Sequence, residues 1–376
     1  MHSSAVVFPD RFDLISALRP AATVGYHTRM RRIFRLFSLS SMFAAATAAP
    51  LAAQNSVLLV PDSGLNKVWA FSPFDGSIVS PDFIPADGLL AQPIQAIPSG
   101  TGTIIITDEV QKAVFEYSAS GTYIRTLAAG LVNCYAACMK DGVAYVTSGF
   151  SQAGIGGLIY RVPLDGSQPT VFSDWTGIGD PRGILPYGDG FLVGNSIDDD
   201  LEIVGPTGGV APFPLVNSDG VTNIDFPQQI HDIGGGNWMV VGFSRPSGIF
   251  FYDNEGVLYR THQGELATIP RGAYLLGNGN ILYTGGTRVE VLDTTTLVTT
   301  TVVNQAGTSF RWIDLYTPPA NCPGDINLSG AVDASDIALL LSAWGTADQA
   351  ADLDDDGIVA ASDIAALLGA WGPCTP

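Results

Sequence analysis

The sequence has little positive charge. Of its 376 residues only 17 are Lys or Arg, whereas 36 are Asp or Glu. Beyond residue 53 the imbalance is larger, with 11 basic and 34 acidic residues and therefore a net charge of −23. A chain this acidic repels phosphate backbones and anionic lipid, which argues against nucleic acid as a partner.

Long apolar runs and catalytic signatures are also missing. No stretch beyond residue 53 approaches the ~18 apolar residues that a membrane-spanning helix needs, so we expect no transmembrane segment. The sequence contains no H-E-x-x-H, G-x-S-x-G or P-loop pattern. Only two histidines, His231 and His262, follow residue 53. The sequence therefore favours a binding protein over an enzyme.

One apolar run does occur, close to the N-terminus. Met30 begins "MRRIFRLFSLSSMFAAATAAPLAAQ", in which three arginines precede a short apolar run and a small-residue exit. This is the layout of a secretory signal peptide. We expect residues 30–53 to be this signal, residues 1–29 to be an upstream mis-start, and the mature chain to be secreted or held at the cell surface. An anchor that is never cut is the alternative.

Residues 55–318 show a repeat of short apolar runs separated by turn signals. Its turn glycines recur at spacings of 45, 45, 42 and 48 residues and are Gly76, Gly121, Gly166, Gly208 and Gly256. A tight hairpin turn uses glycine because the turn needs a positive φ. A sixth unit has "TTT" at 294–296 in place of the glycine.

Each repeat has room for four strands, which is typical of a β-propeller blade. The pattern therefore predicts an all-β fold, a six-bladed propeller over residues 55–318. The first repeat lacks an opening strand, and Ser309–Tyr316 stands unpaired after the sixth. We expect this last segment to complete the first blade and close the ring. A β-sandwich or a β-solenoid is the alternative.

The phrase "LLVPDSGLNKVWAFSPFDGSIV" is similar to the NHL-type propeller repeat, in which an Asp precedes a small-residue turn and an aromatic strand leads to Asp-Gly. "IIITDEVQKAVFEYSASGTYI" follows it less closely, and the other four units keep only the strand rhythm. The resemblance, to NHL- or TolB-like propellers, implies the architecture. It does not imply an activity, since one fold serves many functions.

A duplicated segment follows a short linker at 318–321, within a C-terminal module at 322–376. "DINLSGAVDASDIALLLSAWG" and "DLDDDGIVAASDIAALLGAWG" are offset by 27 residues. Each fits a twelve-position calcium loop with oxygen donors at alternate positions and glycine at position 6. The expected ligands of two Ca²⁺ ions are Asp325, Asn327, Ser329, Ala331 (backbone), Asp333 and Asp336, and then Asp352, Asp354, Asp356, Ile358 (backbone) and Asp363. Solvated acidic turns without metal are the alternative.

Each loop is followed by a helical pattern with Ile, Leu and Trp on one stripe, for which we expect burial. The duplicated loop and helix resemble the type I dockerin module, an EF-hand-like module that docks on cohesin domains. The resemblance implies a cohesin-like or cell-surface partner, contacted at loop positions 10 and 11, which are Ala334, Ser335, Ala361 and Ser362. A self-contained calcium module for attachment or stability is the alternative.

The four cysteines fall into two pairs. Cys322 and Cys374 bracket the C-terminal module, and in an exported protein we expect them to form a disulfide. Cys134 and Cys138 are four residues apart, too far to bond within a regular strand. We interpret them as buried thiols, with a local bridge as the alternative.

Alignment of the opening strands places Ile94, Cys134, Arg182, Gln228, Arg271 and Arg311 at one position. Opening strands line the channel of a propeller, so we expect the three arginines to hold a small anion such as the carboxylate of an acidic sugar, with Gln228 and His231 nearby. Arginines paired with acids between blades are the alternative.

The sequence thus predicts a secreted calcium-binding protein whose propeller recognises an extracellular protein or glycan and whose dockerin-like module tethers it. The second hypothesis is a hydrolase or lyase in polysaccharide catabolism, because dockerins usually accompany such enzymes. A third is a lactonase-like metal site built from scattered Asp and Asn residues.

Overall fold

A computed structural model describes residues 56–149, 157–174, 178–318, 322–327, 331–348, 351–354 and 356–374. The expected mis-start and signal peptide, residues 1–53, lie outside the described residues, as do Ser329 and Gly330 of the first loop.

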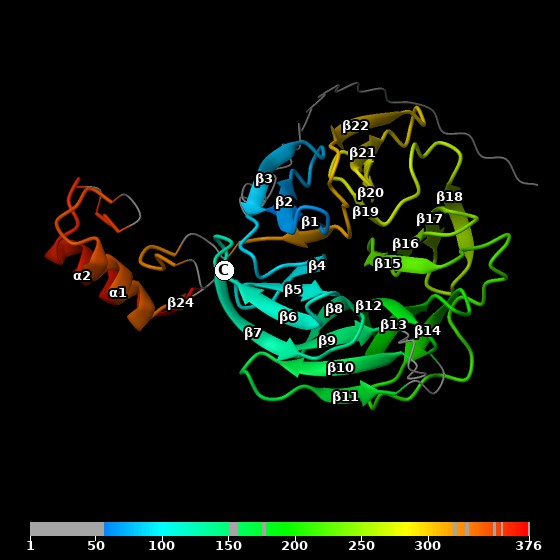
Figure 1. Ribbon diagram of the computed structural model, residues 1–376, viewed down its shortest axis with the longest axis horizontal. Coiled ribbons are helices and arrows are strands. Elements are labelled where there is room, and N and C mark those ends of the chain that lie inside the picture. The colour runs from blue at the N-terminus through cyan, green and yellow to red at the C-terminus, as the bar shows by residue number, and fades with distance from the viewer. Residues whose placement is uncertain are drawn as a thin grey trace, which may run out of the picture. The chain divides into compact units, whose positions relative to one another are not determined.

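Six antiparallel sheets follow one another around a ring, which confirms the six-bladed propeller (Figure 1). Blade one contains β1 (Val57–Asp62), β2 (Lys67–Phe71), β3 (Ile78–Ile84) and β23 (Asp314–Tyr316). Blade two contains β4 (Pro93–Pro98), β5 (Ile104–Asp108), β6 (Ala113–Tyr117) and β7 (Tyr123–Ala129). Blade three contains β8 (Cys134–Lys140), β9 (Val143–Ser148), β10 (Leu158–Pro163) and β11 (Thr170–Ser173).

The remaining blades continue the series. Blade four contains β12 (Pro181–Tyr187), β13 (Gly190–Asn195) and β14 (Asp200–Val204). Blade five contains β15 (Pro227–Asp232), β16 (Trp238–Gly242), β17 (Gly248–Tyr252) and β18 (Leu258–His262). Blade six contains β19 (Gly272–Leu275), β20 (Ile281–Gly285), β21 (Arg288–Leu292) and β22 (Thr299–Asn304).

The strand sequences explain their place in each blade. The second strands of blades two, four, five and six are buried along their whole length, as expected for apolar runs covered on both faces. The outer strands β3, β7, β18 and β22 are mostly exposed and carry polar residues. The five turn glycines have φ angles from 76° to 86°, which confirms their predicted role.

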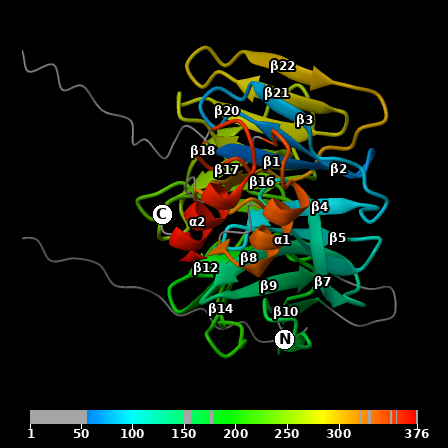
Figure 2. The same ribbon diagram turned by 90° about the vertical axis from the view of Figure 1, so that its left-hand side faces the viewer.

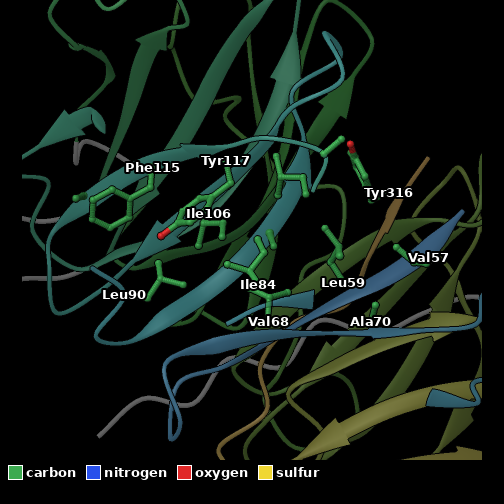
Figure 3. Close-up of a cluster of buried hydrophobic side chains, with 14 residues drawn as sticks. Val57, Leu59, Val68, Ala70, Ile84, Leu90, Ile106, Phe115, Tyr117 and Tyr316 are labelled. Carbon is green, nitrogen blue, oxygen red and sulfur yellow. The ribbon is translucent and has the colours of Figure 1, made fainter. Parts of the chain in front are cut away.

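One hydrophobic cluster fills each of the six interfaces between neighbouring blades. Figure 3 shows the cluster between blades one and two, which includes Val57 and Leu59 of β1, Ile106 of β5 and Phe115 of β6. Another of the six clusters joins blades six and one, which follow one another in the side view of Figure 2.

The C-terminal strand closes the ring as predicted. β23 pairs antiparallel with β1, with Tyr316 opposite Val57 and Asp314 opposite Leu59. Phe310 forms an isolated bridge with Asp62 ahead of this strand. The first and last segments of the propeller therefore share one sheet, and no inner edge is left unpaired there.

Blade four differs from the expectation of four strands in every repeat. It has three strands, and the following chain makes only isolated bridges, between Val204 and Val210 and between Leu201 and Val216. Pro212 and Pro214 lie in this stretch. Proline has no backbone N–H to donate, so two prolines in this stretch remove two donors that a regular fourth strand could use.

The C-terminal segment has two short helices, α1 (Ala334–Ser342) and α2 (Ala361–Gly369), and a small pair of strands, β24 (Ala331–Val332) and β25 (Gly372–Pro373). Its core contains matched residues from the two repeats: Val332 with Val359, and Leu340 with Leu367. Trp344 and Trp371 are 47% and 52% exposed, so the expected burial of both tryptophans was wrong. The fully buried core of this segment therefore consists of small and aliphatic residues, without either tryptophan.

The cysteine predictions are confirmed. Cys322 and Cys374 form a disulfide with a Cα–Cα distance of 5.6 Å. Cys134 and Cys138 are free, buried thiols in β8. Burial raises the pKa of both thiols, so neither is a reactive thiolate.

No helix in the described part of the chain is long and apolar enough to cross a membrane.

Candidate functional site

The inner strands of the blades line the central channel, and buried threonines hold them in place. Thr147 of β9 accepts a hydrogen bond from the Ala136 N–H and donates one to the Arg182 carbonyl of the next blade. Thr284 of β20 accepts from the Gly272 N–H and donates to the Arg311 carbonyl. Each hydroxyl therefore bridges two inner strands and fixes the backbone that carries an arginine.

Arg182, Arg271 and Arg311, hereafter the arginine cluster, lie where the inner strands begin. The Arg182 guanidinium lies 3.7 Å from the centre of the Tyr135 ring and forms an ion pair with Asp180 at 2.8 Å. The Arg271 guanidinium lies 4.6 Å from the centre of the Phe243 ring. The Nε of Arg311 donates to the Ser63 hydroxyl at 2.6 Å.

The three guanidinium charges act on one another. Burial, and then the charge of Arg271, lower the pKa of Arg311 to about 10, and Glu109 opposes this shift. Burial also lowers the pKa of Arg271, while Glu109 raises it and Arg182 lowers it. The three arginines therefore lie close enough for their charges to interact, while their role in holding an anion stays a prediction.

Pairing with acids accounts for only one member of the cluster. Arg182 pairs with Asp180, which lies two residues away on the same blade. Among the residues that the structure describes, neither Arg271 nor Arg311 forms an ion pair. The group contains three arginines and two acids, Glu109 and Asp180, so it carries one more positive than negative charge.

Two residues of this site were not found from the sequence. Glu109 accepts hydrogen bonds from the Gln92 amide and from the Tyr135 hydroxyl, the latter at 3.2 Å. Both Glu109 and Tyr135 are partly buried. Tyr135 directly follows the aligned position in β8, and Glu109 directly follows β5. Tyr135 could have been identified from the sequence by also considering the residues next to the aligned position in each inner strand.

Gln228 is the second residue of β15, as Arg182 is of β12, so it keeps its predicted place at the start of its strand, whereas His231 does not. Gln228 is buried, with 6% exposed. The Nε2 of His231 lies 2.9 Å from the Ile313 carbonyl, and His231 is the fifth residue of β15, away from the start of that strand. Burial lowers the pKa of His231 to about 4, so its ring is neutral at pH 7.

The second of the two predicted calcium loops brings three carboxylates together. Ligand atoms of Asp352, Asp354 and Asp356 lie within 4.8 Å of one another. Gly357 at loop position 6 has a φ of 91°, as the sharp turn of a calcium loop requires. The donor set consists of hard oxygens, which calcium prefers, so the residues present fit this ion.

Asp363 at position 12 anchors the same loop. It is fully buried and accepts hydrogen bonds from the backbone N–H groups of Leu353 at 2.7 Å, Asp354 at 3.2 Å and Ala360 at 2.7 Å. These bonds lower its pKa. Asp363 therefore stays ionised and holds both ends of the loop together.

The first loop has an equivalent anchor, Asp336. Asp336 is fully buried and accepts from the N–H groups of Asn327 at 3.1 Å and Asp333 at 2.8 Å. Asp333 caps α1 by accepting from the Ser335 N–H at 2.7 Å. The equivalent position in the second loop is Ala360, whose side chain cannot cap a helix.

The four residues of the expected partner contact lie at the first turns of the two helices. Ala334 and Ser335 begin α1, Ala361 and Ser362 begin α2, and all four are exposed. Leu341 and Trp344, with Leu368 and Trp371 at the same offset of 27 residues, are exposed as well. The repeat thus presents a matched pair of surfaces.

Comparison with known proteins identifies the fold and no family. No family model matches the chain. A search of curated proteins finds no match either.

Solved structures resemble the propeller. A chain from the crystal structure of a nidogen/laminin complex is 16% identical, with a TM-score of 0.56, and the match covers 69% of this chain and 98% of that one. A protein of unknown function from Bacteroides caccae is 17% identical over the same shares, with a TM-score of 0.52. A gluconolactonase from Xanthomonas campestris is 15% identical, covering 61% of this chain and 79% of that one, with a TM-score of 0.49. At these identities the likeness concerns the fold alone.

Proposed function

We propose that this chain is a secreted calcium-binding protein whose propeller holds a carboxylate-bearing ligand at the arginine cluster and whose C-terminal module tethers it to a partner. The observation that carries the proposal is that the charges of Arg182, Arg271 and Arg311 act on one another, while among the described residues only Arg182 forms an ion pair, with Asp180. Like charges are costly to hold together, and an added anion would relieve that repulsion.

The chemistry of the cluster favours a carboxylate. A guanidinium group offers paired N–H donors that match the two oxygens of a carboxylate. Tyr135 and Phe243 stack on the guanidinium groups of Arg182 and Arg271 and so limit their movement. The net charge of −23 repels a long polyanion, so a single uronic acid residue or a short acidic glycan is the ligand that fits best.

The tethering role rests on the duplicated C-terminal loops. The carboxylates of Asp352, Asp354 and Asp356 would hold calcium in the second loop, and calcium would order the exposed first turns of α1 and α2 for a cohesin-like or cell-surface partner. The similar chain in a nidogen/laminin complex belongs to a protein–protein assembly, so this fold is compatible with binding to another protein.

The test compares trigalacturonate with galactotriose, which has the same sugar geometry without carboxylates. Titration calorimetry on the full chain should detect trigalacturonate only, with affinity that falls as salt is added. Arg271→Ala should weaken binding about tenfold or more, equivalent to ~1.4 kcal/mol, and Arg182→Ala with Arg271→Ala should abolish it.

The matched control is Arg260→Ala, which removes an exposed arginine on the outer strand β18. It should bind trigalacturonate as the wild type does. Unchanged binding in the double variant, or equal binding of galactotriose, would refute the arginine site. Cleavage of trigalacturonate during the titration would favour the polysaccharide-degrading enzyme instead.

A further inference from the structure

A cavity of about 210 Å³ lies among the inner strands, toward their C-terminal ends. Its residues come from β4, β8, β12 and β15 and from Asp314 of β23. The inner strands of a propeller run in the same direction along the channel. The arginine cluster lies where these strands begin, so the cavity and the cluster occupy different ends of the channel.

The floor of the cavity is a carboxylate without a cationic partner. Asp314 accepts hydrogen bonds from the Gln95 amide at 3.0 and 3.1 Å and from the Gln229 amide at 3.3 Å. Within the described part of the chain it forms no ion pair. Lys140, whose charge acts on Cys138 of the cavity wall, donates to the Gly188 carbonyl at 3.1 Å. Asp314 therefore keeps acceptor capacity for a ligand and, when it is ionised, an unpaired negative charge among the described residues.

The other polar groups of the cavity accept hydrogen bonds as well. The Nε2 of His231 lies 2.9 Å from the Ile313 carbonyl, so this nitrogen carries the hydrogen. A neutral imidazole then offers its Nδ1 as an acceptor. Asp232 adds a second carboxylate at the exposed end of β15. A cavity with acceptors of this kind fits a ligand that donates hydrogen bonds and carries positive charge.

The walls define the rest of the ligand. They are apolar and include Ile97, Met139, Ile184, Leu185 and Ile230. In the part of the chain that is described, ligand atoms of three acidic, His or Cys residues converge only at Asp352, Asp354 and Asp356, so this cavity lacks the donor set of a metal site. At about 30 Å³ per water, the volume corresponds to roughly seven waters, enough for a small ring or a short alkyl chain.

We propose that this cavity is a second binding site, which takes a small primary amine with its ammonium group on Asp314 and its apolar body against the aliphatic wall. Such a ligand gives the Asp314 carboxylate a cationic partner and displaces water from apolar surface. The propeller would then bind opposite charges at the two ends of its channel.

Protonation of Asp314 gives the proposal a measurable consequence. Burial raises the pKa of Asp314 to about 7, against the lowering effect of Gln95. The titratable or charged groups around it are His231, Asp232, Tyr274 and, next to Cys138 of the wall, Lys140. An ammonium group favours the ionised carboxylate, so amine binding should release a proton from Asp314 near neutral pH.

The experiment uses three probes that share a cyclohexane ring and differ in their polar group: cyclohexylamine, cyclohexanol and cyclohexanecarboxylate. Calorimetric titration of the full chain at about pH 8 should give a dissociation constant of ~1 mM for cyclohexylamine, consistent with a few favourable contacts for seven heavy atoms. Cyclohexanol should bind at least about tenfold more weakly, since it lacks the ion pair. Cyclohexanecarboxylate should not bind in this cavity.

Asp314→Asn should reduce cyclohexylamine affinity by about tenfold or more, whereas the control Asp82→Asn, which removes an exposed carboxylate on β3, should not. If Asp314→Asn does not fold, the wild type decides the question. Its affinity for cyclohexylamine should fall between about pH 8 and pH 6 as Asp314 takes a proton. Equal binding of amine and alcohol, absence of amine binding, or affinity independent of pH and of Asp314 would overturn the proposal.

Discussion

At the scale of single residues, burial sets the charge of groups along the channel. His231 is held neutral and Asp314 is held partly protonated, because burial removes much of the water around both. Their shifts have opposite effects on stability. The depressed pKa of His231 costs stability as pH falls, whereas the raised pKa of Asp314 costs stability as pH rises.

The contribution of His231 can be measured directly. Between its ordinary pKa of 6.5 and its folded pKa of about 4, the unfolded chain binds a proton that the folded protein does not. The free energy of unfolding should therefore fall by up to about 3 kcal/mol over this range because of His231. His231→Gln keeps an N–H donor near the Ile313 carbonyl and should lose that dependence.

Urea unfolding of the wild type and of His231→Gln at pH 7, 6, 5 and 4 tests this. The difference in unfolding free energy between the two proteins should change steadily toward low pH, in favour of the variant. Asp314 titrates in both proteins, so its effect largely cancels in the difference. Parallel pH profiles would contradict the assignment.

The sequence predicted some of these residues and missed others for a physical reason. Arg182, Arg271 and Arg311 occupy one repeated position, and repetition makes them visible in the chain. Glu109 and Asp314 have no repeated equivalents, and their importance comes from blades that are distant in sequence. Asp314 meets Gln95 across 219 residues, which no local pattern can indicate.

At the scale of elements, the inner strands depend on hydroxyl groups behind them. Thr284 accepts from the Gly272 N–H at 3.0 Å, donates to the Arg311 carbonyl, and through its own carbonyl accepts from the Arg271 N–H at 2.8 Å. One residue of β20 therefore holds the backbone of two members of the arginine cluster.

Thr284→Val keeps the shape of this side chain and removes its hydroxyl. The buried Gly272 N–H and Arg311 carbonyl would each lose a partner, which should lower the free energy of unfolding by about 2 kcal/mol. Trigalacturonate affinity should fall several-fold, because Arg311 loses its fixed position. Urea unfolding and calorimetric titration measure the two effects.

The control is Thr300→Val, which makes the same change at an exposed position of the outer strand β22. It should alter stability by less than about 0.5 kcal/mol and leave binding unchanged. Equal effects of the two substitutions would show that the hydroxyl bridge at Thr284 has no special role.

Turn chemistry made most elements predictable. The glycines at five hairpins take positive φ angles, as the spacing indicated. Blade four has three strands although its repeat is long enough for four. The segment after β14 contains Pro212 and Pro214, which lack backbone donors, and it forms only isolated bridges. Repeat spacing alone therefore predicts how many blades form, and the backbone donors in each segment decide how many strands pair.

At the scale of the whole molecule, ring closure and the C-terminal duplication were both visible in the sequence. The closing strand was recognised because it lacked a partner in its own repeat, and it pairs with β1. Burial of the two tryptophans was predicted wrongly, because helical spacing indicates a stripe without saying which part of it meets the core. Leu340 and Leu367 fill that core, and Trp344 and Trp371 remain about half exposed.

Calcium removal should destabilise the C-terminal module and leave the propeller unaffected. Nine aspartates and no basic residue follow Cys322, so without calcium the C-terminal module repels itself. The disulfide, which spans 52 residues, restricts the conformations of the unfolded module and contributes roughly 4 kcal/mol to its stability. It cannot neutralise the negative charge. We expect the module to unfold in chelator while the propeller, which has its own hydrophobic clusters, stays folded.

Scanning calorimetry of the full chain should show two transitions in calcium, and EGTA should remove the module's transition alone. Asp352→Ala should raise the calcium concentration needed to restore it, by about tenfold or more, because one of three converging carboxylates is lost. Asp348→Ala removes a carboxylate outside the loop and should behave as the wild type does. A module that melts identically in calcium and in EGTA would contradict the calcium assignment, whereas loss of the propeller transition would show that the two parts fold as one unit.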